Sequence, residues 1–542
     1  MQKKYIFVVG GVMSSVGKGI ATASIAKILQ SKGFAVSTVK CDMYINIDAG
    51  TIRPTEHGEV FIGQDGIEAD QDLGNYERFT GIASTRENYI TTGQVYQEVI
   101  RKERNMEYKG EDVEVVPDIP NEIIRRIKQA SLKDKAQITI IEMGGTIGEY
   151  QNLLFLEAAR MMKLKNPEDV IFVMVSYLPV PSKVGEMKTK PTQHAVRCLN
   201  SAGIQVDFIL GRSEKPMDKK RKEKLSMFCG IPIENVISAP DVDSIYEVPI
   251  NFEKEKLSER ILEKFKLEPK KSNLDDWEEL IGKIKSLKDE VKLAIVGKYF
   301  STGSFVLSDS YISVIEAIKH ACWKNNVKPN LIWVDSEKFE ENPDSVETLG
   351  QYDAIIVPGG FGSRGVEGII SSIKYARENK IPFLGLCYGM QLAVIEFSRN
   401  MAGMSNANSV EINPNTKYPV IDIMEEQKKN MQMSNYGATM RLGNYSCSLI
   451  KGTGSHKYYN RETVLERHRH RYEFNNKYLD LLKSKGLVIG GINKERNLVE
   501  IVELKDHPFF VGVQFHPEFN SRPMEPHPLF FNLIKSVVGR KQ

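Results

Sequence analysis

The sequence predicts an α/β protein made of two doubly wound α/β domains. Three observations support this fold class: short apolar runs alternate with helical patterns, the runs are continuously apolar, and the alternation is interrupted once, near residue 267. Continuous apolar runs are typical of parallel strands, because helices cover both faces of such a sheet. With 542 residues the chain also exceeds the size of one ordinary hydrophobic core.

The first half of the chain combines five expected strands with helical segments, and we expect it to form a domain over residues 1–266. The expected strands are Tyr5–Val9, Ala35–Val39, Gln137–Glu142, Val170–Ser176 and Asp207–Leu210. The expected helices include Ile20–Ser31 and Asn121–Ala130.

A change in composition marks the end of this domain. Residues 267–273 show no apolar periodicity and are predicted to start a linker over 267–290, with a short helix at Asp275–Lys285. A second α/β alternation follows, which predicts a second domain over residues 291–542. Its expected strands include Val291–Val296, Leu331–Val334, Ala354–Val357 and Phe383–Leu386.

The charge balance and the cysteines narrow the class of protein. The 73 basic and 70 acidic residues give a net charge of +3, so we expect neither nucleic acid nor a membrane surface as the main partner. The basic run Lys219–Lys222 is interpreted as solvated surface.

The six cysteines form no CxxC pair, which favours neither a zinc knuckle nor a disulfide framework. With no signal pattern and no apolar span of ~20 residues, we expect a cytoplasmic protein.

The glycine-rich stretch Gly10–Gly19 (GGVMSSVGKG) follows the first expected strand and precedes a helix. Its backbone N–H groups and the helix N-terminus would bind phosphate, and Lys18 would neutralise β/γ-phosphate charge. The spacing departs from the usual phosphate-loop pattern, and Gly19 replaces the Ser or Thr that would bind Mg²⁺. We therefore expect Asp72 and Glu142 to hold the metal. The alternative is a strand–helix turn that binds no ligand.

The run Gly385–Gly389 (GLCYG) is typical of a tight strand-to-helix turn that presents a nucleophile, here Cys387. The helix that follows would stabilise a thiolate. His516 is the candidate base and Glu518 its orienting group. The glycine-rich turn Pro358–Gly362 could supply an oxyanion hole. The alternative for any single cysteine is a buried structural thiol.

The tract RHRHR at residues 467–471 could suggest a metal site. The i,i+2 spacing of His468 and His470 does not favour metal binding.

Together these motifs resemble a known family. PGGFG, GLCYGMQ and QFHPE resemble class I glutamine amidotransferase domains. With SSVGKG, YINIDAGT, GEMKTKPTQH, DVDSIY and ERHRHRYE, the chain resembles the CTP synthase family nearly end to end. The resemblance implies an N-terminal P-loop-like amidoligase domain and a C-terminal class I glutaminase domain.

The resemblance also implies an activity. Members make CTP from UTP, ATP and glutamine: ATP phosphorylates O4 of the uracil ring, and ammonia then displaces the phosphate. Glutamine hydrolysis through a thioester on Cys387 supplies the ammonia, which passes through an internal tunnel. GTP activates the glutaminase step, CTP inhibits at the UTP site, and the usual assembly is a homotetramer. Filament formation could coexist with activity.

Site residues follow from the resemblance by position. The residues implied for ATP are Ser15, Val16, Gly17, Lys18, Gly19, Ile20, Lys40, Asp72, Pro240, Asp241 and Val242, and those for Mg²⁺ are Asp72 and Glu142. Those implied for UTP and CTP are Ser14, Glu149, Tyr150, Gln151, Lys188, Thr189, Lys190, Pro191, Thr192, Gln193 and Lys224. Those implied for glutamine are Gly360, Tyr388, Gly389, Met390, Gln391, Glu411 and Arg471, and Arg364 is implied in GTP activation.

The chain departs from the family pattern at one informative place. Where the family usually reads GGTxGDIES, this chain has Glu149 for an Asp and Gln151 for a Glu. These positions normally contact bound CTP, so the strength of CTP feedback is open.

Two alternatives differ in class from this interpretation. Another amidotransferase ligase, such as one acting on a cobyrinate-type acid, would lack KTKPTQH and DVDSIY. A non-catalytic filament or scaffold protein would not be expected to keep Cys387, His516, Glu518, Lys18, Asp72 and Glu142.

Overall fold

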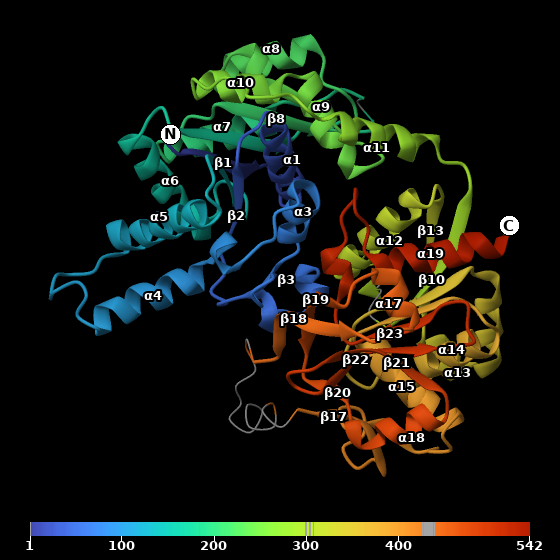
Figure 1. Cartoon of the computed structure of the whole chain (residues 1–542). Helices are drawn as coiled ribbons and strands as arrows, with labels where there is room; N and C mark the ends of the chain where they lie inside the picture. Colours follow the sequence, from blue (N-terminus) through green and yellow to red (C-terminus); the bar gives the residue numbers. More distant parts are fainter. Residues whose placement is uncertain are drawn as a thin grey trace. The chain divides into compact units, whose positions relative to one another are not determined.

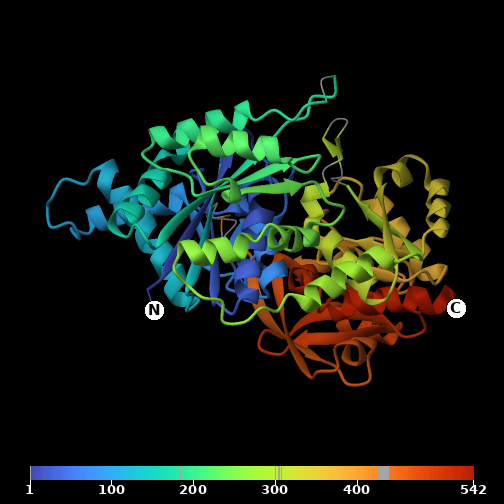
Figure 2. The ribbon, with the colours of Figure 1, turned by 90° about the horizontal axis from the view of Figure 1, so that it is seen from above.

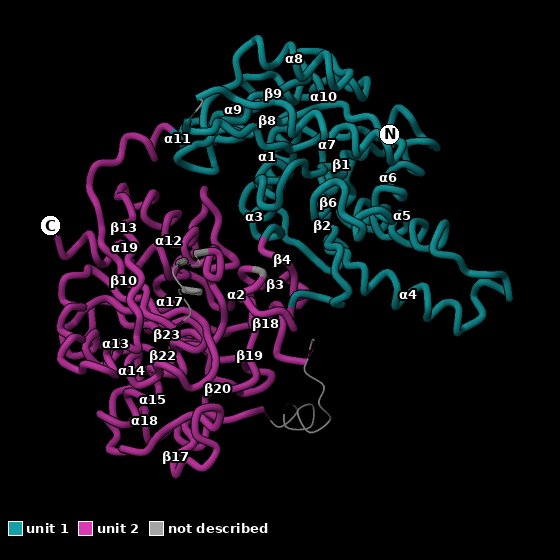
Figure 3. The backbone as a smooth tube through the Cα atoms, turned by 180° about the vertical axis from the view of Figure 1, so that it is seen from behind, with its two compact units in different colours: residues 1–49, 72–281 teal, residues 50–71, 282–542 magenta. Residues whose placement is uncertain are grey.

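The chain forms two compact units in a computed structural model (Figures 1 and 3). The structure describes residues 2–183, 185–298, 301–302, 305–306, 308–424, 427, 437 and 439–541. Unit 1 contains residues 1–49 and 72–281, and unit 2 contains residues 50–71 and 282–542.

Unit 1 is built around a parallel sheet of seven strands in the order β5-β2-β6-β1-β7-β8-β9. The strands are β1 (Lys4–Gly11), β2 (Val36–Asp42), β5 (Tyr89–Thr91), β6 (Ile138–Met143), β7 (Val170–Tyr177), β8 (Phe208–Ser213) and β9 (Val236–Pro240). The helices are α1 (Lys18–Ser31), α3 (Asp72–Thr80), α4 (Thr92–Arg104), α5 (Val115–Lys133), α6 (Leu153–Lys165), α7 (Lys190–Ser201), α8 (Lys219–Cys229), α9 (Val248–Lys254) and α10 (Leu257–Lys264). Helix α11 (Asp275–Ser286) confirms the predicted helix after residue 273 and leads into unit 2.

Alternate residues of the strands enter two different cores, as the continuous apolar runs predicted. In β1, Ile6 and Val8 pack with α1, α9 and α10, whereas Phe7 and Val9 pack on the opposite face with α5, α6 and α7. All five strands predicted for this half are present, with ends that differ by at most three residues. Helices α4 and α5 lie side by side (Figure 1), where Glu122 of α5 bonds Lys102 of α4 at 2.8 Å.

The strand order reverses direction at β1. Strands β6 and β2 lie on one side of β1, and β7, β8 and β9 lie on the other. In open parallel sheets, ligands bind at the carboxyl ends of the strands where the order reverses. The loop that leaves β1 at this point is Gly10–Gly19, so the fold puts the predicted phosphate loop at the expected place.

Unit 2 contains a sheet of nine strands in the order β13-β10-β14-β15-β23-β22-β21-β18-β19. Its first five strands are parallel, and the remaining four extend the sheet in antiparallel fashion, which the sequence patterns did not indicate. The strands are β10 (Glu290–Gly297), β13 (Lys328–Asp335), β14 (Ala354–Val357), β15 (Phe383–Leu386), β18 (Arg441–Leu449), β19 (Thr463–His470), β21 (Leu487–Asn493), β22 (Leu498–Leu504) and β23 (Phe510–Val513). The four strands predicted for this half are confirmed.

Helices cover both faces of this sheet, so the α/β class predicted for both halves is confirmed. In Figure 2 the red helix α19 ends at the C-terminus. The helices are α12 (Ile312–Lys324), α13 (Glu337–Glu341), α14 (Val366–Glu378), α15 (Tyr388–Asn400), α17 (Gly454–Tyr459), α18 (Leu479–Ser484) and α19 (Pro528–Lys541). The small strands are β11 (Ser301–Thr302), β12 (Phe305–Val306), β16 (Ala407–Ser409), β17 (Tyr418–Ile423) and β20 (Tyr472–Phe474).

Residues 50–71 belong to unit 2 although they lie far from it in the sequence. They form α2 (Pro54–His57) and a hairpin of β3 (Val60–Ile62) and β4 (Glu68–Asp70). Arg467 donates to the Ile62 carbonyl at 2.9 Å, and Arg469 pairs with Glu68 at 2.8 Å. The domain bounds 1–266 and 291–542 stay a prediction, since a packing unit and a sequence domain need not coincide.

None of the helices in the described part of the chain is long and apolar enough to span a bilayer.

Candidate active site

Cys387 lies in a strained turn between β15 and α15. Its backbone has φ 49° and ψ −97°, a left-handed φ that residues other than glycine rarely adopt. The flanking glycines are required by space: a Cβ at Gly389 would lie 2.3 Å from the Val357 carbonyl oxygen, and one at Gly385 would lie 2.7 Å from the Gly389 carbonyl carbon. The turn therefore presents a side chain at the carboxyl end of the sheet, as the predicted nucleophile turn would.

The sheet register brings His516 to Cys387. Strand β23 is the neighbour of β15, and Val513 is the register partner of Leu386, the residue before Cys387. His516 follows three residues after Val513, and its Nδ1 is 2.8 Å from Glu518 Oε1. Because Glu518 engages Nδ1, the other ring nitrogen is left for the thiol. Sulfur, imidazole and carboxylate thus occur in the order that a nucleophile, base and orienting group require.

The electrostatics of His516 suit this role. Burial alone lowers the pKa of His516, but the Glu518 carboxylate and the Cys387 thiol outweigh burial and raise it to about 10. The histidine is therefore positively charged at neutral pH and can stabilise a thiolate on Cys387.

We expect the titration of His516 to depend on Glu518. In Glu518→Gln the opposing carboxylate is lost, so burial should bring the pKa of His516 down from about 10. NMR of histidine ring carbons between pH 5 and 11 measures this shift. The raised pKa also predicts that the contribution of His516 to stability is complete below about pH 6.5 and is lost as the pH rises toward 10. An unchanged His516 titration in Glu518→Gln would contradict the assignment of Glu518.

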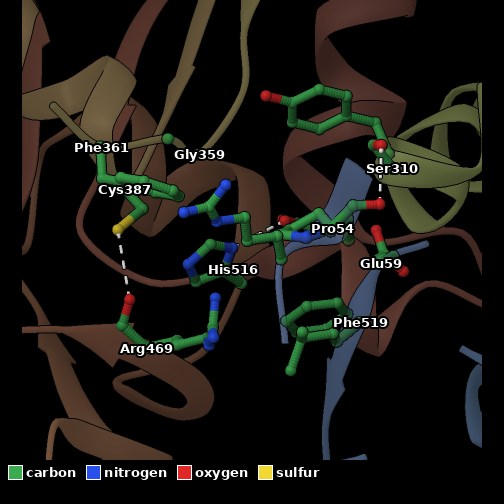
Figure 4. Close-up of a pocket in the computed structure, with 14 residues that line it drawn as sticks. Pro54, Glu59, Ser310, Gly359, Phe361, Cys387, Arg469, His516 and Phe519 are labelled. Carbon is green, nitrogen blue, oxygen red and sulfur yellow. Dashed lines mark hydrogen bonds and ion pairs between the residues drawn. The ribbon is translucent and has the colours of Figure 1, made fainter. Parts of the chain in front are cut away.

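A cavity of about 490 Å³ opens over these residues within unit 2 (Figure 4). Cys387 and His516 face it together with Gly359 and Phe361 of the predicted oxyanion turn. A Cβ at Gly359 would lie 2.8 Å from the His516 ring, so only glycine fits there. The complete lining is Arg53, Pro54, Glu59, Val60, Ser310, Tyr311, Gly359, Gly360, Phe361, Cys387, Arg469, His516, Glu518 and Phe519.

Three residues predicted for glutamine lie around the Gly359–Gly362 turn. Gly360 lines the cavity, and the Glu411 carboxylate accepts a hydrogen bond from the Gly362 amide at 2.8 Å. The Tyr388 hydroxyl donates to the Gly362 carbonyl at 2.5 Å. Burial raises the pKa of Glu411. These contacts fix the backbone of the turn beside Cys387.

The other residues predicted to bind glutamine lie in different surroundings. Gln391 donates to the Tyr472 carbonyl at 2.8 Å. Met390 is fully buried in the core of unit 2. Arg471 bonds Gln427 at 2.7 Å and Thr439 at 2.8 Å. Arg364, predicted for GTP activation, pairs with Glu337 and donates to the Lys298 carbonyl at 3.4 Å.

The predicted phosphate loop Gly10–Gly19 lies in unit 1 between β1 and α1. Gly17 at the start of α1 has φ 91°, and Ser15 has φ 54°, so the loop folds back over the end of β1. Lys18 is buried and donates to the Gly145 carbonyl at 2.7 Å. Burial lowers the pKa of Lys18, although the nearby Glu142 carboxylate opposes this. The N-terminus of α1 and a lysine therefore face the same loop.

The two residues predicted for the metal lie together beside this loop. Lys40 Nζ bonds Asp72, and it lies 2.9 Å from Glu142 Oε1, so the two carboxylates share one ammonium. Burial and the Asp72 charge raise the pKa of Glu142 to about 7. Mg²⁺ is commonly held by one or two carboxylates plus phosphate oxygens and water, and this pair fits that pattern. No group of three or more metal-binding side chains occurs within the described ranges.

A second cavity, of about 370 Å³, lies beside the phosphate loop in unit 1. Gly17 and Ile20 of the loop and helix line it together with Pro240, Asp241 and Val242, the residues predicted for the adenosine part of ATP. Arg212 connects the two sides, because it bonds Asp241 at 2.6 Å and the Val16 carbonyl at 3.5 Å. The size and position suit a nucleoside next to a bound phosphate.

Most residues predicted for UTP and CTP lie on α7 and just before it. Thr189, Pro191, Thr192 and Gln193 occur at its N-terminus with Lys188 and Lys190, and Lys224 lies on α8. The approach of α7 to the phosphate loop is tight, since a Cβ at Gly11 would lie 2.9 Å from the Ala195 Cβ. Ser14 lies in the loop itself. Glu149, Tyr150 and Gln151 precede α6, where Tyr150 is 90% exposed.

Sequence reasoning missed several residues at the cysteine centre. Gln514 is fully buried and donates to Cys387 Sγ at 3.6 Å, and Cys387 Sγ is 3.8 Å from the Arg469 carbonyl oxygen. The sequence did offer a signal for Gln514, because it is the first residue of the motif QFHPE. Arg53, Pro54, Glu59 and Val60 had no signal for this place, because they lie more than 300 residues before Cys387.

The tract RHRHR forms the end of β19 in unit 2. Burial lowers the pKa of His468 and His470 well below the usual range, so both rings are neutral. Their nitrogens lie 3.1 Å apart, and Arg441 pairs with Glu500 at 2.6 Å in the same buried cluster.

Comparison with known proteins assigns both halves of the chain. Residues 4–267 match the family described as CTP synthase N-terminus, and residues 306–536 match glutamine amidotransferase class-I. A protein named CTP synthase from Caldanaerobacter subterraneus subsp. tengcongensis is 49% identical over 99% of this chain and 99% of its own length. Another of that name from Sulfolobus acidocaldarius is 49% identical over 98% of this chain and 99% of its own length.

Sequence similarity also extends to a solved structure. The glutaminase domain of Trypanosoma brucei CTPS with bound acivicin is 38% identical, with a TM-score of 0.43, and covers 46% of this chain and 94% of that domain.

Proposed function

This chain belongs to the CTP synthase family, and from that premise we propose a reaction at two centres that consumes ATP and transfers ammonia between them. The protein is a ligase that makes CTP from UTP with nitrogen from glutamine. The observation that supports the proposed chemistry best is the Cys387–His516–Glu518 arrangement at the ends of two adjacent strands.

At the glutaminase centre, the Cys387 thiolate attacks the side-chain carbonyl carbon of glutamine. The negative oxygen is stabilised by amides of the Gly359–Phe361 turn. His516 gives a proton to the leaving ammonia, and a thioester remains on Cys387. Water, deprotonated by His516, then releases glutamate and restores the thiol. Gly360, Tyr388, Glu411 and Arg471 would hold the substrate.

At the synthase centre, O4 of UTP attacks the γ-phosphorus of ATP, and ADP leaves. Ammonia then attacks C4 of the ring, and phosphate leaves to give CTP. The loop Ser15–Ile20 with Lys18 and Lys40 would bind the phosphates, and Pro240–Val242 would contact adenosine. Asp72 and Glu142 would hold Mg²⁺, which supplies charge neutralisation at the transferred phosphoryl group when bound.

Ammonia is proposed to travel through an internal tunnel, because ammonia released to water at neutral pH would be protonated and unreactive. The cavity over Cys387 supports this route, because it offers released ammonia a space beside the thioester.

Regulation and assembly are also proposed from family membership. GTP would activate the glutaminase step with the help of Arg364, and CTP would compete with UTP. The active form would be a cytoplasmic homotetramer, and filament formation is compatible with it.

The test follows the absorbance change as UTP becomes CTP with ATP and Mg²⁺, with either glutamine or ammonium chloride as nitrogen source. CTP from both sources is the expected result. CTP from ammonium alone would mean an impaired glutaminase or tunnel, and CTP from neither would contradict the proposed function.

Gln151 is expected to weaken CTP feedback. Its side-chain amide donates to Glu149 Oε2 at 2.6 Å, while Glu149 Oε1 accepts from the Thr146 amide at 2.9 Å. Both oxygens of Glu149 are therefore engaged, and a CTP hydroxyl must compete for them. Gln151→Glu should lower the inhibition constant of CTP roughly threefold to tenfold, which corresponds to about one hydrogen bond.

The measurement is the inhibition constant of CTP against UTP, with Gln151→Ala as the variant that removes the amide without adding a carboxylate. A wild-type constant equal to that of a relative with the usual carboxylate would refute this explanation.

A further inference from the structure

Lys40 lies among three carboxylates, two of them buried, at the carboxyl end of the sheet in unit 1. Its Nζ bonds Asp72, lies 2.9 Å from Glu142 Oε1 and lies 3.8 Å from Asp42 Oδ1. Lys40 is 5% exposed and Glu142 is 1% exposed, so this ammonium is largely removed from water. Lys40 pairs directly with these carboxylates, and the charge of Lys18 acts on Glu142 from nearby.

The surrounding side chains hold the two nearest carboxylates in this arrangement. The Tyr76 hydroxyl donates to Glu142 Oε2, and Asn75 Nδ2 lies 3.4 Å from Asp72 Oδ1. Gly19 leaves the space for Asp72, because a Cβ there would lie 1.8 Å from Asp72 Oδ1. The remaining oxygen of each carboxylate is thus directed at Lys40.

Asp72 and Glu142 are the same two carboxylates that the proposed function gives to Mg²⁺. Mg²⁺ binds oxygen at about 2.0–2.1 Å, so a metal on these oxygens would lie close to the Lys40 ammonium, and repulsion between the two cations opposes joint occupancy. Resting on that proposed function, we propose that Lys40 takes the place of Mg²⁺ when ATP is absent. Binding of magnesium–ATP then exchanges the two cations, and the Lys40 ammonium moves from the carboxylates to the triphosphate.

The charge balance explains why ATP must accompany the exchange. Glu142 is buried and the Asp72 side chain is 21% exposed, so loss of the Lys40 ammonium would leave at least one buried carboxylate without its bonded cation, which is unfavourable unless a metal replaces it. Asp72 and Glu142 offer the metal two carboxylates, and phosphate oxygens together with water would complete its coordination. The triphosphate supplies these oxygens and also a new partner for the lysine. Metal and nucleotide should therefore bind together.

The test measures binding of Mn²⁺, as a probe for Mg²⁺, by the electron paramagnetic resonance of free Mn²⁺. The wild-type protein is titrated with and without a non-hydrolysable ATP analogue. We expect the analogue to tighten Mn²⁺ binding at least tenfold. In Lys40→Met, Mn²⁺ should bind without the analogue at least tenfold more tightly than in wild type, and it should raise the unfolding temperature of that variant.

Lys18→Met is the matched control, because it removes the same charge from the same region, but Lys18 bonds the Gly145 carbonyl and not the carboxylates. Its Mn²⁺ affinity without the analogue should rise less than in Lys40→Met, because Lys18 acts on Glu142 through charge alone and does not bond its oxygens. Lys40→Gln replaces Lys40→Met if the latter does not fold. Equal wild-type affinity with and without the analogue would overturn the cation exchange alone. Failure to bind Mn²⁺ even with the analogue would overturn the proposed magnesium–ATP site, and the exchange with it.

Discussion

Replacing Cys387 by alanine should abolish CTP synthesis from glutamine and leave CTP synthesis from ammonium chloride intact. In the proposed mechanism the thioester forms on the sulfur of Cys387, which alanine lacks. Glutamine-dependent turnover should therefore fall on the order of 10⁴-fold or more. The synthase centre uses residues of unit 1 and receives ammonia directly when ammonium is supplied. The measurement is the initial rate of CTP formation with each nitrogen source at saturating UTP and ATP.

The matched control is Cys322→Ala, which removes another buried thiol of unit 2. Cys322 is fully buried in α12 and is not among the residues that line the cavity. This variant should keep both activities. Loss of ammonia-dependent synthesis in Cys387→Ala, with a normal unfolding temperature, would contradict the division into two centres.

The local parts of both sites were predictable because the relevant residues are close in the sequence. The turn at Cys387 needs only a strand, two glycines and a helix in succession, and the structure has β15, the turn and α15 in that order. The phosphate loop likewise depends on β1 and α1 alone. His516 and Glu518 are two residues apart, so their pairing could also be predicted from the sequence.

The remaining parts depend on contacts between distant segments. Strands β3 and β4 have three residues each, too few for a clear periodic pattern, and their hairpin is fixed by Arg467 and Arg469 about 400 residues later. The position of Lys40 between Asp72 and Glu142 depends on the pairing of β2 with β6 and on α3. Sequence patterns predict elements, whereas these positions depend on which elements become neighbours.

Replacing Lys18 by methionine should remove CTP synthesis from both nitrogen sources. Lys18 begins α1 at the phosphate loop, where its ammonium would stabilise the charge that develops as the γ-phosphoryl group is transferred. Methionine keeps the length and apolar character of the buried stem but carries no charge. Since phosphorylation of UTP precedes attack by either source of ammonia, both rates should fall by at least about 10²–10³-fold.

The control for this prediction is Lys27→Met, the same substitution nine residues later on α1. Lys27 lies 4.7 Å from the centre of the Trp277 ring, about 13 Å along the helix axis from Lys18. It should leave both activities near wild type, so that an effect confined to Lys18→Met cannot arise from a general loss of charge on α1. If Lys18→Met made CTP from ammonium at a normal rate, the phosphate of ATP would have to be bound elsewhere. The Gly10–Gly19 loop would then be a strand–helix turn without a ligand, the alternative that its unusual spacing had left open.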